Sequence, residues 1–263
     1  MVAEIVFDHV TFRYPDGDRD IFTELDLEIL PGVVSLVGQN GTGKSTLLLL
    51  ASGRVLPTIG SVRIRGKDTR ELEDEAERQK LVSFIYQNME FESEETIGEL
   101  LRFVQANGLA RSADPETLAE LVEVFELRPV LGRRTQQVSK GELQRTLLAF
   151  SLLYGSPILA MDEPIFAMEE REKLKSMDFL LAAARKGHVS LFYSIHELDI
   201  SRDYSDFILL FSRGAPPRIG PTAEIFTREI IEKAYEVPFD MLKRREELYR
   251  KYLVELLRVR GEG

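Results

Sequence analysis

The run SLVGQNGTGKSTLLLL, residues 35–50, constrains the fold of this chain more than any other feature. It satisfies the pattern G-x-x-x-x-G-K-[ST] with Gly38, Gly43, Lys44 and Ser45. An apolar strand-like run precedes the pattern and an apolar helix-like run follows it. Glycines in such a place let backbone N–H groups converge on an anion at the positive end of a helix. The pattern predicts a phosphate-binding loop between a strand and a helix.

The side chains of this loop suit the phosphates of a nucleotide. Lys44 can bridge the β- and γ-phosphates, Ser45 can ligate Mg²⁺, and Thr46 adds a further hydroxyl. We expect the remainder of the loop to contact ATP as well: Gly38, Asn40, Gly41, Thr42 and Gly43.

A pair of carboxylates ends a second apolar run. In PILAMDEP, four apolar residues lead into Asp162 and Glu163. Phosphoryl transfer depends on positioning and on charge neutralisation. Asp162 would hold the Mg²⁺ shell, and Glu163 would orient or deprotonate the attacking water. An acidic exit from a strand is common, but downstream of a phosphate loop the functional interpretation is favoured.

Short unbroken apolar runs recur along the chain, at residues 33–37, 81–86, 157–161, 188–195 and 207–211. Such runs are typical of central parallel strands that are covered on both faces. Helical stretches separate several of them, so the chain is predicted to be α/β, with a mostly parallel central sheet. At the N-terminus, two alternating runs, HVTFRY at residues 9–14 and LDLEI at residues 25–29, flank the turn PDGD and predict an antiparallel ribbon.

The pattern becomes helical between residues 89 and 155, where apolar residues recur at three- and four-residue spacing. Asp114-Pro115 suits a cap and the first turn of one helix. We predict one domain, with an α/β core over 1–88 and 156–240 and an inserted helical subdomain over 89–155.

A final helix is predicted over residues 241–263. Leu242, Tyr249, Leu253 and Leu256 fall on one face of it. This face would pack on the same domain or on a second copy. An interfacial helix near anionic lipid is the alternative.

Six motifs, taken in order, resemble those of the ATP-binding cassette (ABC) ATPases, and the resemblance covers nearly the whole chain. GQNGTGKST is similar to the Walker A motif and ILAMDEP to Walker B. Gln87 resembles the Q-loop glutamine, and His196 resembles the switch histidine. Tyr14 resembles the aromatic residue that stacks on adenine. VSKGELQR, with Ser139 and Gly141, is similar to the signature motif. Taken alone, Tyr14 could be an ordinary strand aromatic and His196 a structural histidine.

The resemblance implies a P-loop ATPase in which two cassettes sandwich two ATP molecules head to tail. The phosphate loop of one subunit would face the signature turn of the other. Catalysis is assigned to Glu163, His196, Gln87 and Lys44, and Mg²⁺ to Ser45, Gln87 and Asp162. Beyond the phosphate loop, ATP would contact Tyr14, Ser139 and Gly141.

The chain departs from the family in two places. Lys140 stands where the signature motif usually has glycine, so a side chain lies at the edge of a site that favours bare backbone. Its positive charge would lie near phosphates, which attract it. The D-loop usually reads SALD, whereas this chain has FAME, Phe166 to Glu169. Because Lys44, Asp162 and Glu163 are intact, we expect hydrolysis to persist, and a regulator that has lost hydrolysis is disfavoured.

Composition limits the classes of partner that the chain is expected to bind. The net charge of −10 disfavours nucleic acid, and no apolar run is long enough to span a membrane. The absence of cysteine suits a reducing cytosol. We therefore expect a cytoplasmic subunit, peripheral on the inner face of the cell membrane. Its partners would be transmembrane permease subunits and a second ABC subunit, either identical or a paralogue.

The C-terminal residues make this expectation more specific. Residues Gly220 to Leu242 are similar to the C-terminal run of ATPases that power import of iron chelates, haem and cobalamin. The competing hypothesis is a soluble ABC ATPase that serves a cytosolic assembly process, such as iron–sulfur cluster building.

Overall fold

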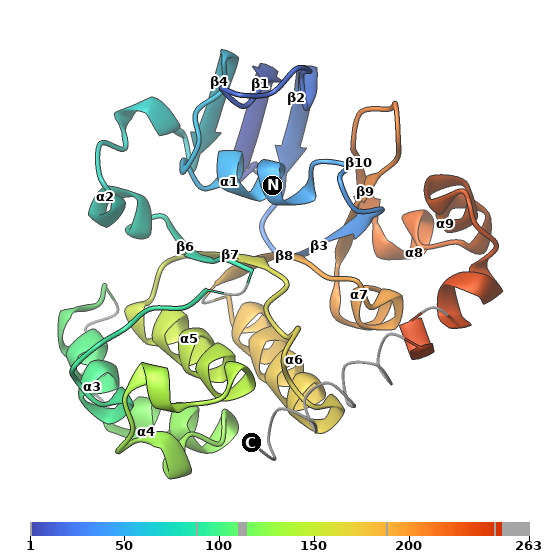
Figure 1. The fold of residues 1–263 in the computed structure, drawn as a ribbon. Coiled ribbons are helices and arrows are strands. Elements are labelled where there is room, and N and C mark those ends of the chain that lie inside the picture. Colours follow the sequence, from blue (N-terminus) through green and yellow to red (C-terminus); the bar gives the residue numbers. More distant parts are fainter. Residues whose placement is uncertain (1, 88, 110–114, 188, 245, 249–263) are drawn as a thin grey trace.

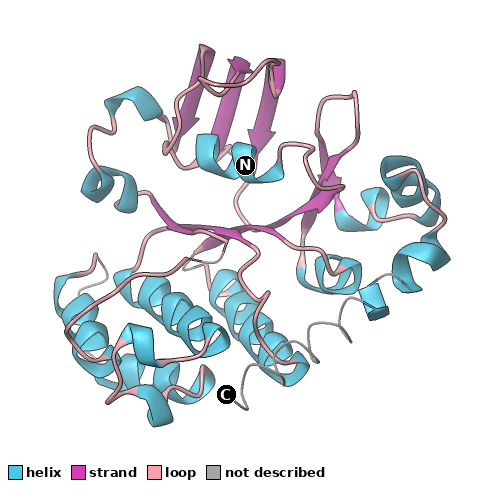
Figure 2. Ribbon diagram, viewed as in Figure 1, coloured by secondary structure: helices cyan, strands magenta, loops and turns pink. Residues whose placement is uncertain are grey.

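The computed structural model of the chain describes residues 2–87, 89–109, 115–187, 189–244 and 246–248 (Figure 1). Two sheets and several helices form layers. A larger sheet runs through the middle, a smaller sheet lies on one side of it, and most of the helices lie on the other side (Figure 2).

The larger sheet has six strands in the order β10-β9-β3-β8-β7-β6. Its strands are β3 (Val33–Gly38), β6 (Val82–Ile85), β7 (Ile158–Asp162), β8 (Ser190–Ser194), β9 (Phe207–Phe211) and β10 (Arg218–Pro221). β10 pairs antiparallel with β9, and the other pairs are parallel. The prediction of an α/β fold with a mostly parallel sheet is confirmed. Each apolar run of the sequence supplies one of the parallel strands, and the edge strand β10 was not predicted.

β3 is buried over all six residues, because both faces of the sheet are covered. On one face, helix α1 (Lys44–Ala51) lies between the two sheets (Figure 1). Its Leu47, Leu48 and Leu50 are fully buried in a core that includes side chains of both sheets. The run of leucines after the phosphate loop therefore anchors that loop in the centre of the molecule.

The smaller sheet has the order β2-β1-β4-β5 and is antiparallel. Its strands are β1 (Ile5–Phe12), β2 (Phe22–Ile29), β4 (Ile59–Ile64) and β5 (Lys67–Asp68). The predicted ribbon is confirmed, and β4 and β5 extend it into a sheet.

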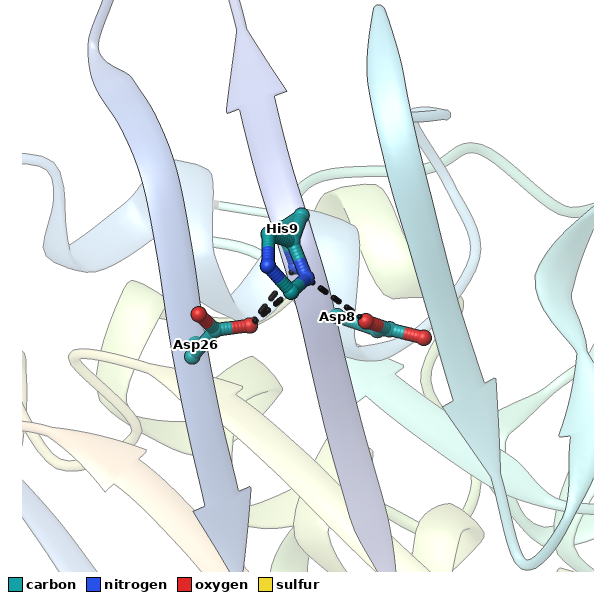
Figure 3. A group of neighbouring side chains, drawn as sticks. All are labelled: Asp8, His9 and Asp26. Atoms are coloured by element: carbon teal, nitrogen blue, oxygen red, sulfur yellow. Dashed lines mark hydrogen bonds and ion pairs between the residues drawn. The ribbon is translucent and has the colours of Figure 1, made fainter.

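β1 begins before the alternating run that predicted it, because an irregularity near His9 reverses the alternation. His9 has a φ of 48°, and its backbone N–H donates to Asp26 Oδ1 at 2.8 Å (Figure 3). The ring Nδ1 lies 2.9 Å from Asp8 Oδ1. Ile5 and Phe7 on one side of the irregularity, and Val10 on the other, all point into the core.

Further α-helices in the described part of the chain are α2 (Glu75–Gln79), α3 (Ile97–Asn107), α4 (Pro115–Val124), α5 (Lys140–Tyr154), α6 (Glu170–Arg185), α7 (Leu198–Tyr204), α8 (Thr222–Ile225) and α9 (Arg228–Tyr235). Helices α5 and α6 lie against the far face of the larger sheet, and α3 and α4 pack on α5 (Figure 1). α3 begins at a capping box, in which Thr96 and Glu99 satisfy each other's backbone N–H groups. The predicted cap Asp114 lies outside the described residues.

The C-terminal part packs against β9. Ile225, Ile231, Ala234 and Leu242 form a third buried cluster there with residues of β9. Leu242 is thus buried in its own domain, as one of the predicted alternatives required. Tyr249, Leu253 and Leu256 lie outside the described residues. None of the helices in the described part of the chain combines the length and the apolar character that a bilayer crossing requires.

Candidate functional site

A cleft of about 340 Å³ opens where the parallel strands end. It is lined by Ile21, Asn40, Gly41, Gly43, Lys44, Ser45, Thr46, Gln87, Asp162, Glu163 and His196. These residues follow β3, β6, β7 and β8, apart from Ile21, which precedes β2. Parallel strands bring their carboxyl ends to one edge of a sheet, so residues far apart in sequence meet there. Ile21 was not predicted, because nothing in its local sequence distinguishes it from a core residue.

The phosphate loop turns tightly between β3 and α1. Gly43 is the N-cap of α1 and has a φ of 102°, in the left-handed region. A β-carbon added to Gly43 would lie 2.9 Å from the ring of Phe22. Only glycine fits here, both for its backbone angle and for the space. The loop thereby presents the first turn of α1, with its unpaired N–H groups, to the cleft.

Lys44 is buried beneath the loop, with 7% of its surface exposed. Its Nζ donates to the carbonyl oxygens of Gly38 at 2.8 Å and Gln39 at 2.9 Å. Burial lowers the pKa of Lys44, and the nearby charges of Glu163 and Asp162 oppose that shift. A buried ammonium group whose partners are mainly backbone carbonyls provides charge that a phosphate can engage.

The two carboxylates are held by β8. Ser194 Oγ donates to Asp162 Oδ1. The backbone N–H of Glu163 lies 3.2 Å from Ser194 Oγ and 3.3 Å from the Ser194 carbonyl. Glu163 also has a φ of 54°, a conformation that costs a side-chain-bearing residue free energy and that clusters at functional sites. Ser194 is thus part of the site, although its local sequence shows only an apolar strand.

Glu163 is 6% exposed. Burial, reinforced by the charge of Asp162, raises the pKa of Glu163 to about 8. His196 Nε2 lies 3.1 Å from Glu163 Oε1. A carboxylate whose conjugate acid has a raised pKa is a stronger base than an ordinary carboxylate, so the ionised form of Glu163 can take a proton from a water molecule in the cleft, which is the behaviour of a general base.

A buried ion pair supports the segment that follows His196. Lys173 of α6 is 4% exposed, and its Nζ lies 2.5 Å from Glu197 Oε1. The pair links α6 to the residue next to His196. Sequence analysis missed it because the partners are 24 positions apart and no motif joins them.

Tyr14 stands beside the cleft and does not line it. It lies beyond the end of β1, so it is not an ordinary strand aromatic. Its hydroxyl is 3.1 Å from Thr46 Oγ1, and its ring packs edge-on against Phe12. With 38% of its surface exposed, the ring can accept a planar partner.

Two other loop residues that were expected to contact ATP also lie outside the lining of the cleft. Thr42 Oγ1 donates to the carbonyl of Gln39 at 2.7 Å, which braces the loop from within. Gly38 lines a neighbouring cavity instead.

Ser139 and Gly141 lie at the start of α5 and are absent from the cleft lining. Ser139 caps α5: its Oγ accepts from the N–H of Glu142 at 3.2 Å, and Glu142 Oε2 accepts from the N–H of Ser139 at 2.7 Å. A β-carbon on Gly141 would lie 2.6 Å from the carbonyl oxygen of Ala167. Gly141 therefore lets the segment after Glu163 pack closely on α5.

Lys140 does not point toward the phosphate loop of its own chain. Its Nζ lies 3.1 Å from Glu90 Oε1, and the two side chains are 53% and 63% exposed. In the isolated chain a carboxylate of the segment after Gln87 is within its reach, and the expectation that its charge lies near phosphates stays a prediction.

Comparisons with known proteins agree with this geometry. A family model described as ABC transporter matches residues 22–166. A putative ABC transporter ATP-binding protein of Archaeoglobus fulgidus is 31% identical over 231 residues, which cover 86% of this chain and 94% of that protein. A hemin import ATP-binding protein of Nitrobacter winogradskyi is 29% identical over 226 residues, covering 82% and 83%.

A sulfate/thiosulfate import ATP-binding protein of Gloeobacter violaceus is 29% identical over 241 residues, which cover 89% of this chain and 67% of that protein. A similar protein of Thermosynechococcus vestitus is matched over 62% of its length. Among solved structures, an ATP-binding subunit of an ABC transporter has a TM-score of 0.75 at 21% identity, covering 92% of this chain and 98% of that one. The resemblance to haem import ATPases is confirmed, and it is matched by the resemblance to sulfate importers. The chain belongs to the ABC transporter family and is one of its ATP-hydrolysing subunits.

Proposed function

We propose that this chain hydrolyses ATP with Mg²⁺ in the cleft and that hydrolysis powers solute transport by a separate membrane subunit. The observation that carries the proposal is an apolar groove beside the segment that follows Gln87. The groove has a volume of about 370 Å³. Its apolar and aromatic lining consists of Phe84, Ile85, Met89, Phe91, Phe103, Val104, Leu147, Phe150 and Tyr154.

The groove exposes large apolar side chains that a self-contained domain would bury. Phe103 of α3 is 65% exposed. Phe91 and Phe150 both line the groove, and their ring centroids are 6.4 Å apart. A hollow lined with aromatic residues is typical of a protein interface. In the family that the chain belongs to, a coupling helix of the membrane subunit docks beside the Q-loop, so we assign that helix to this groove.

One segment joins the groove to the ATP cleft. Gln87 lines the cleft, whereas Met89 and Phe91 line the groove. An occupant that displaces the segment would therefore shift Gln87 relative to Asp162. This connection supports a coupling between docking and hydrolysis.

The first test is at the groove. Phe103→Glu should abolish co-purification with a membrane subunit from detergent-solubilised native membranes, because burying a carboxylate in an apolar interface is costly. The ATPase rate of the purified chain alone should stay within about twofold, since Phe103 is outside the cleft. Leu174→Glu on α6, where the leucine is 40% exposed, is the matched control and should keep the membrane partner. Equal recovery of that partner with both variants would argue against the groove.

The donor set in the cleft fits Mg²⁺, which prefers oxygen ligands. The Ser45 hydroxyl, the Gln87 side-chain oxygen and the Asp162 carboxylate would hold the ion, which neutralises phosphate charge when bound. Lys44 would leave the carbonyls of its own loop for the phosphates, and Tyr14 would stack on adenine. Glu163 would take a proton from the attacking water, with His196 beside it.

A second cassette completes the site in this proposal. Ser139 is exposed and Gly141 is buried at the start of α5, and neither lines the cleft of its own chain. In a head-to-tail pair they would face the phosphate loop of the partner, which is either an identical chain or a paralogue. Hydrolysis would then depend on protein concentration or on the membrane complex.

Lys140 bears little on turnover in this proposal. Because the Lys140–Glu90 pair is solvent-exposed, it contributes at most about 1 kcal/mol. We expect Lys140→Gly to change the ATPase rate by less than about tenfold, equivalent to about 1.4 kcal/mol. Steady-state ATPase assays with the partner present would check this, and a larger loss would show that the lysine contacts the reacting phosphates.

We propose that the transport is import and that the chain sits on the inner face of the membrane. The relatives named for import of sulfate or hemin support this direction. Tagging the chain in its native host and identifying the co-purifying proteins would test it. A multi-span membrane protein is expected. Only soluble partners, with the chain absent from membranes, would favour the cytosolic assembly role instead.

A further inference from the structure

The C-terminal helix α9 holds the phosphate loop from outside the cleft. The backbone N–H of Gly38 donates to the Tyr235 hydroxyl at 3.1 Å. In return, Gln39 Nε2 donates to the carbonyl oxygens of Tyr235 at 2.6 Å and Ala234 at 3.4 Å. The first two residues of the loop are thus bound to a helix almost 200 positions later in the sequence.

The two residues that contact α9 are also the two residues that bind the lysine. The carbonyl oxygens that accept from Lys44 Nζ belong to Gly38 and Gln39. The Gln39 carbonyl also accepts from Thr42 Oγ1. Tyr235 therefore holds the N–H side of the backbone segment whose carbonyl side holds Lys44. Any shift of that segment changes where Lys44 rests and how easily it moves to a phosphate.

α9 is a firm support for this role. Ile231 and Ala234 are buried in the cluster that the C-terminal part forms with β9, with 0% and 2% of their surfaces exposed. The last carbonyls of a helix lack partners within the helix. Here the Gln39 amide satisfies two of them, and Glu236, the residue that caps the end of the helix, has a φ of 57°. The end of the helix and the start of the loop thus satisfy each other's polar groups.

The segment beyond α9 also contacts the region of the switch histidine. Glu246 Oε1 accepts from the N–H of Leu198 at 2.8 Å, two residues after His196. Between these contacts lies a cavity of about 280 Å³ whose lining includes Gly38, Gln39, His196, Leu198 and Tyr235.

We propose that Tyr235 is a positioning residue for ATP binding: it acts through Gly38 and Gln39 to set the resting position of Lys44. It does not touch the nucleotide. The inference rests on ATP binding in the cleft and is independent of any membrane subunit. It predicts that the C-terminal part of the chain tunes nucleotide affinity.

The test is Tyr235→Phe in the full-length chain, with Mg-ATP affinity measured by calorimetry and KM and kcat by steady-state assay. A hydrogen bond is worth about 0.5–1.5 kcal/mol. The Kd and KM for ATP should therefore rise roughly three- to tenfold, with kcat within about twofold. Tyr204→Phe is the matched control, because it removes a tyrosine hydroxyl bond to Asp178 away from the loop, and it should leave Kd unchanged.

A second variant separates positioning from folding. Gln39→Met keeps the side-chain length but removes the bonds to Ala234 and Tyr235, and it should raise Kd in the same way. If both residues act on one backbone segment, the double variant should raise Kd by less than the product of the single effects. A purely structural role would lower the melting temperature of Tyr235→Phe and leave Kd within twofold, and that result would overturn the inference. A parent chain that binds no Mg-ATP would overturn it together with the proposed function, whereas failure to find a membrane partner would affect only the latter.

Discussion

Glu163→Gln is expected to lower kcat for ATP hydrolysis by a factor of about 10² to 10⁴, the contribution of a general base. Glutamine keeps the shape of the side chain but cannot accept a proton from water. The strained backbone at Glu163 and its two hydrogen bonds with Ser194 are backbone features, so the variant should keep the geometry. Binding of Mg-ATP should stay within about threefold, because Lys44, Ser45 and Asp162 are untouched.

Single-turnover and steady-state assays, with the partner present, would measure this effect. Lys140→Gly serves as the comparison, since it alters the signature turn without touching the carboxylates. A kcat within tenfold of the parent for Glu163→Gln would show that another group takes the proton.

The same substitution is expected to stabilise the nucleotide-free chain at alkaline pH. The carboxyl group of Glu163 titrates near 4.5 in its ordinary state and at about 8 in the folded chain, chiefly because it is buried. The folded chain therefore keeps a proton that the unfolded chain loses. The stability that Glu163 contributes is fully present below pH 4.5 and is lost as the pH rises toward 8. Glutamine does not titrate, so the variant avoids this loss.

Denaturant unfolding with a metal chelator and without nucleotide would measure the effect. The free energy of unfolding of Glu163→Gln should exceed that of the parent by roughly 4 kcal/mol at pH 8, and the gain should shrink toward zero near pH 4.5 and below. Glu28→Gln on the exposed side of β2 should change stability by less than about 0.5 kcal/mol at either pH. A gain that does not depend on pH would mean that the difference in stability between glutamate and glutamine comes from packing and not from the buried charge.

Much of the fold followed from local pattern. The unbroken apolar runs marked the parallel strands, because a strand covered on both faces has no polar side. β1 was predicted too short, since the irregularity at His9 shifts the alternation and hides Ile5 and Phe7 from a period-two reading. The edge strand β10 carries no apolar run and gave no signal.

The order of the motifs along the chain was enough to predict which chemical groups meet at the cleft. Lys44, Asp162, Glu163 and His196 follow buried parallel strands, and such strands end at one edge of a sheet. The motifs therefore predicted a shared cleft, although they gave no distances between its residues. Motif spacing did not place Ser139 and Gly141 away from that cleft, and only the resemblance to the ABC ATPases implied that they face another subunit.

The positions and protonation states of these groups depend on contacts that form in the folded chain. Three side-chain contacts join residues from 24 to 197 positions apart, with no periodicity between the partners. They are the hydrogen bond from Ser194 to Asp162, the ion pair of Lys173 with Glu197, and the hydrogen bond between Gly38 and Tyr235. The raised pKa of Glu163 likewise depends on its burial and on the Asp162 charge within the folded chain. Hydrogen bonds and desolvation act through space, so they are set by which segments pack together, and a linear pattern records only the segments themselves.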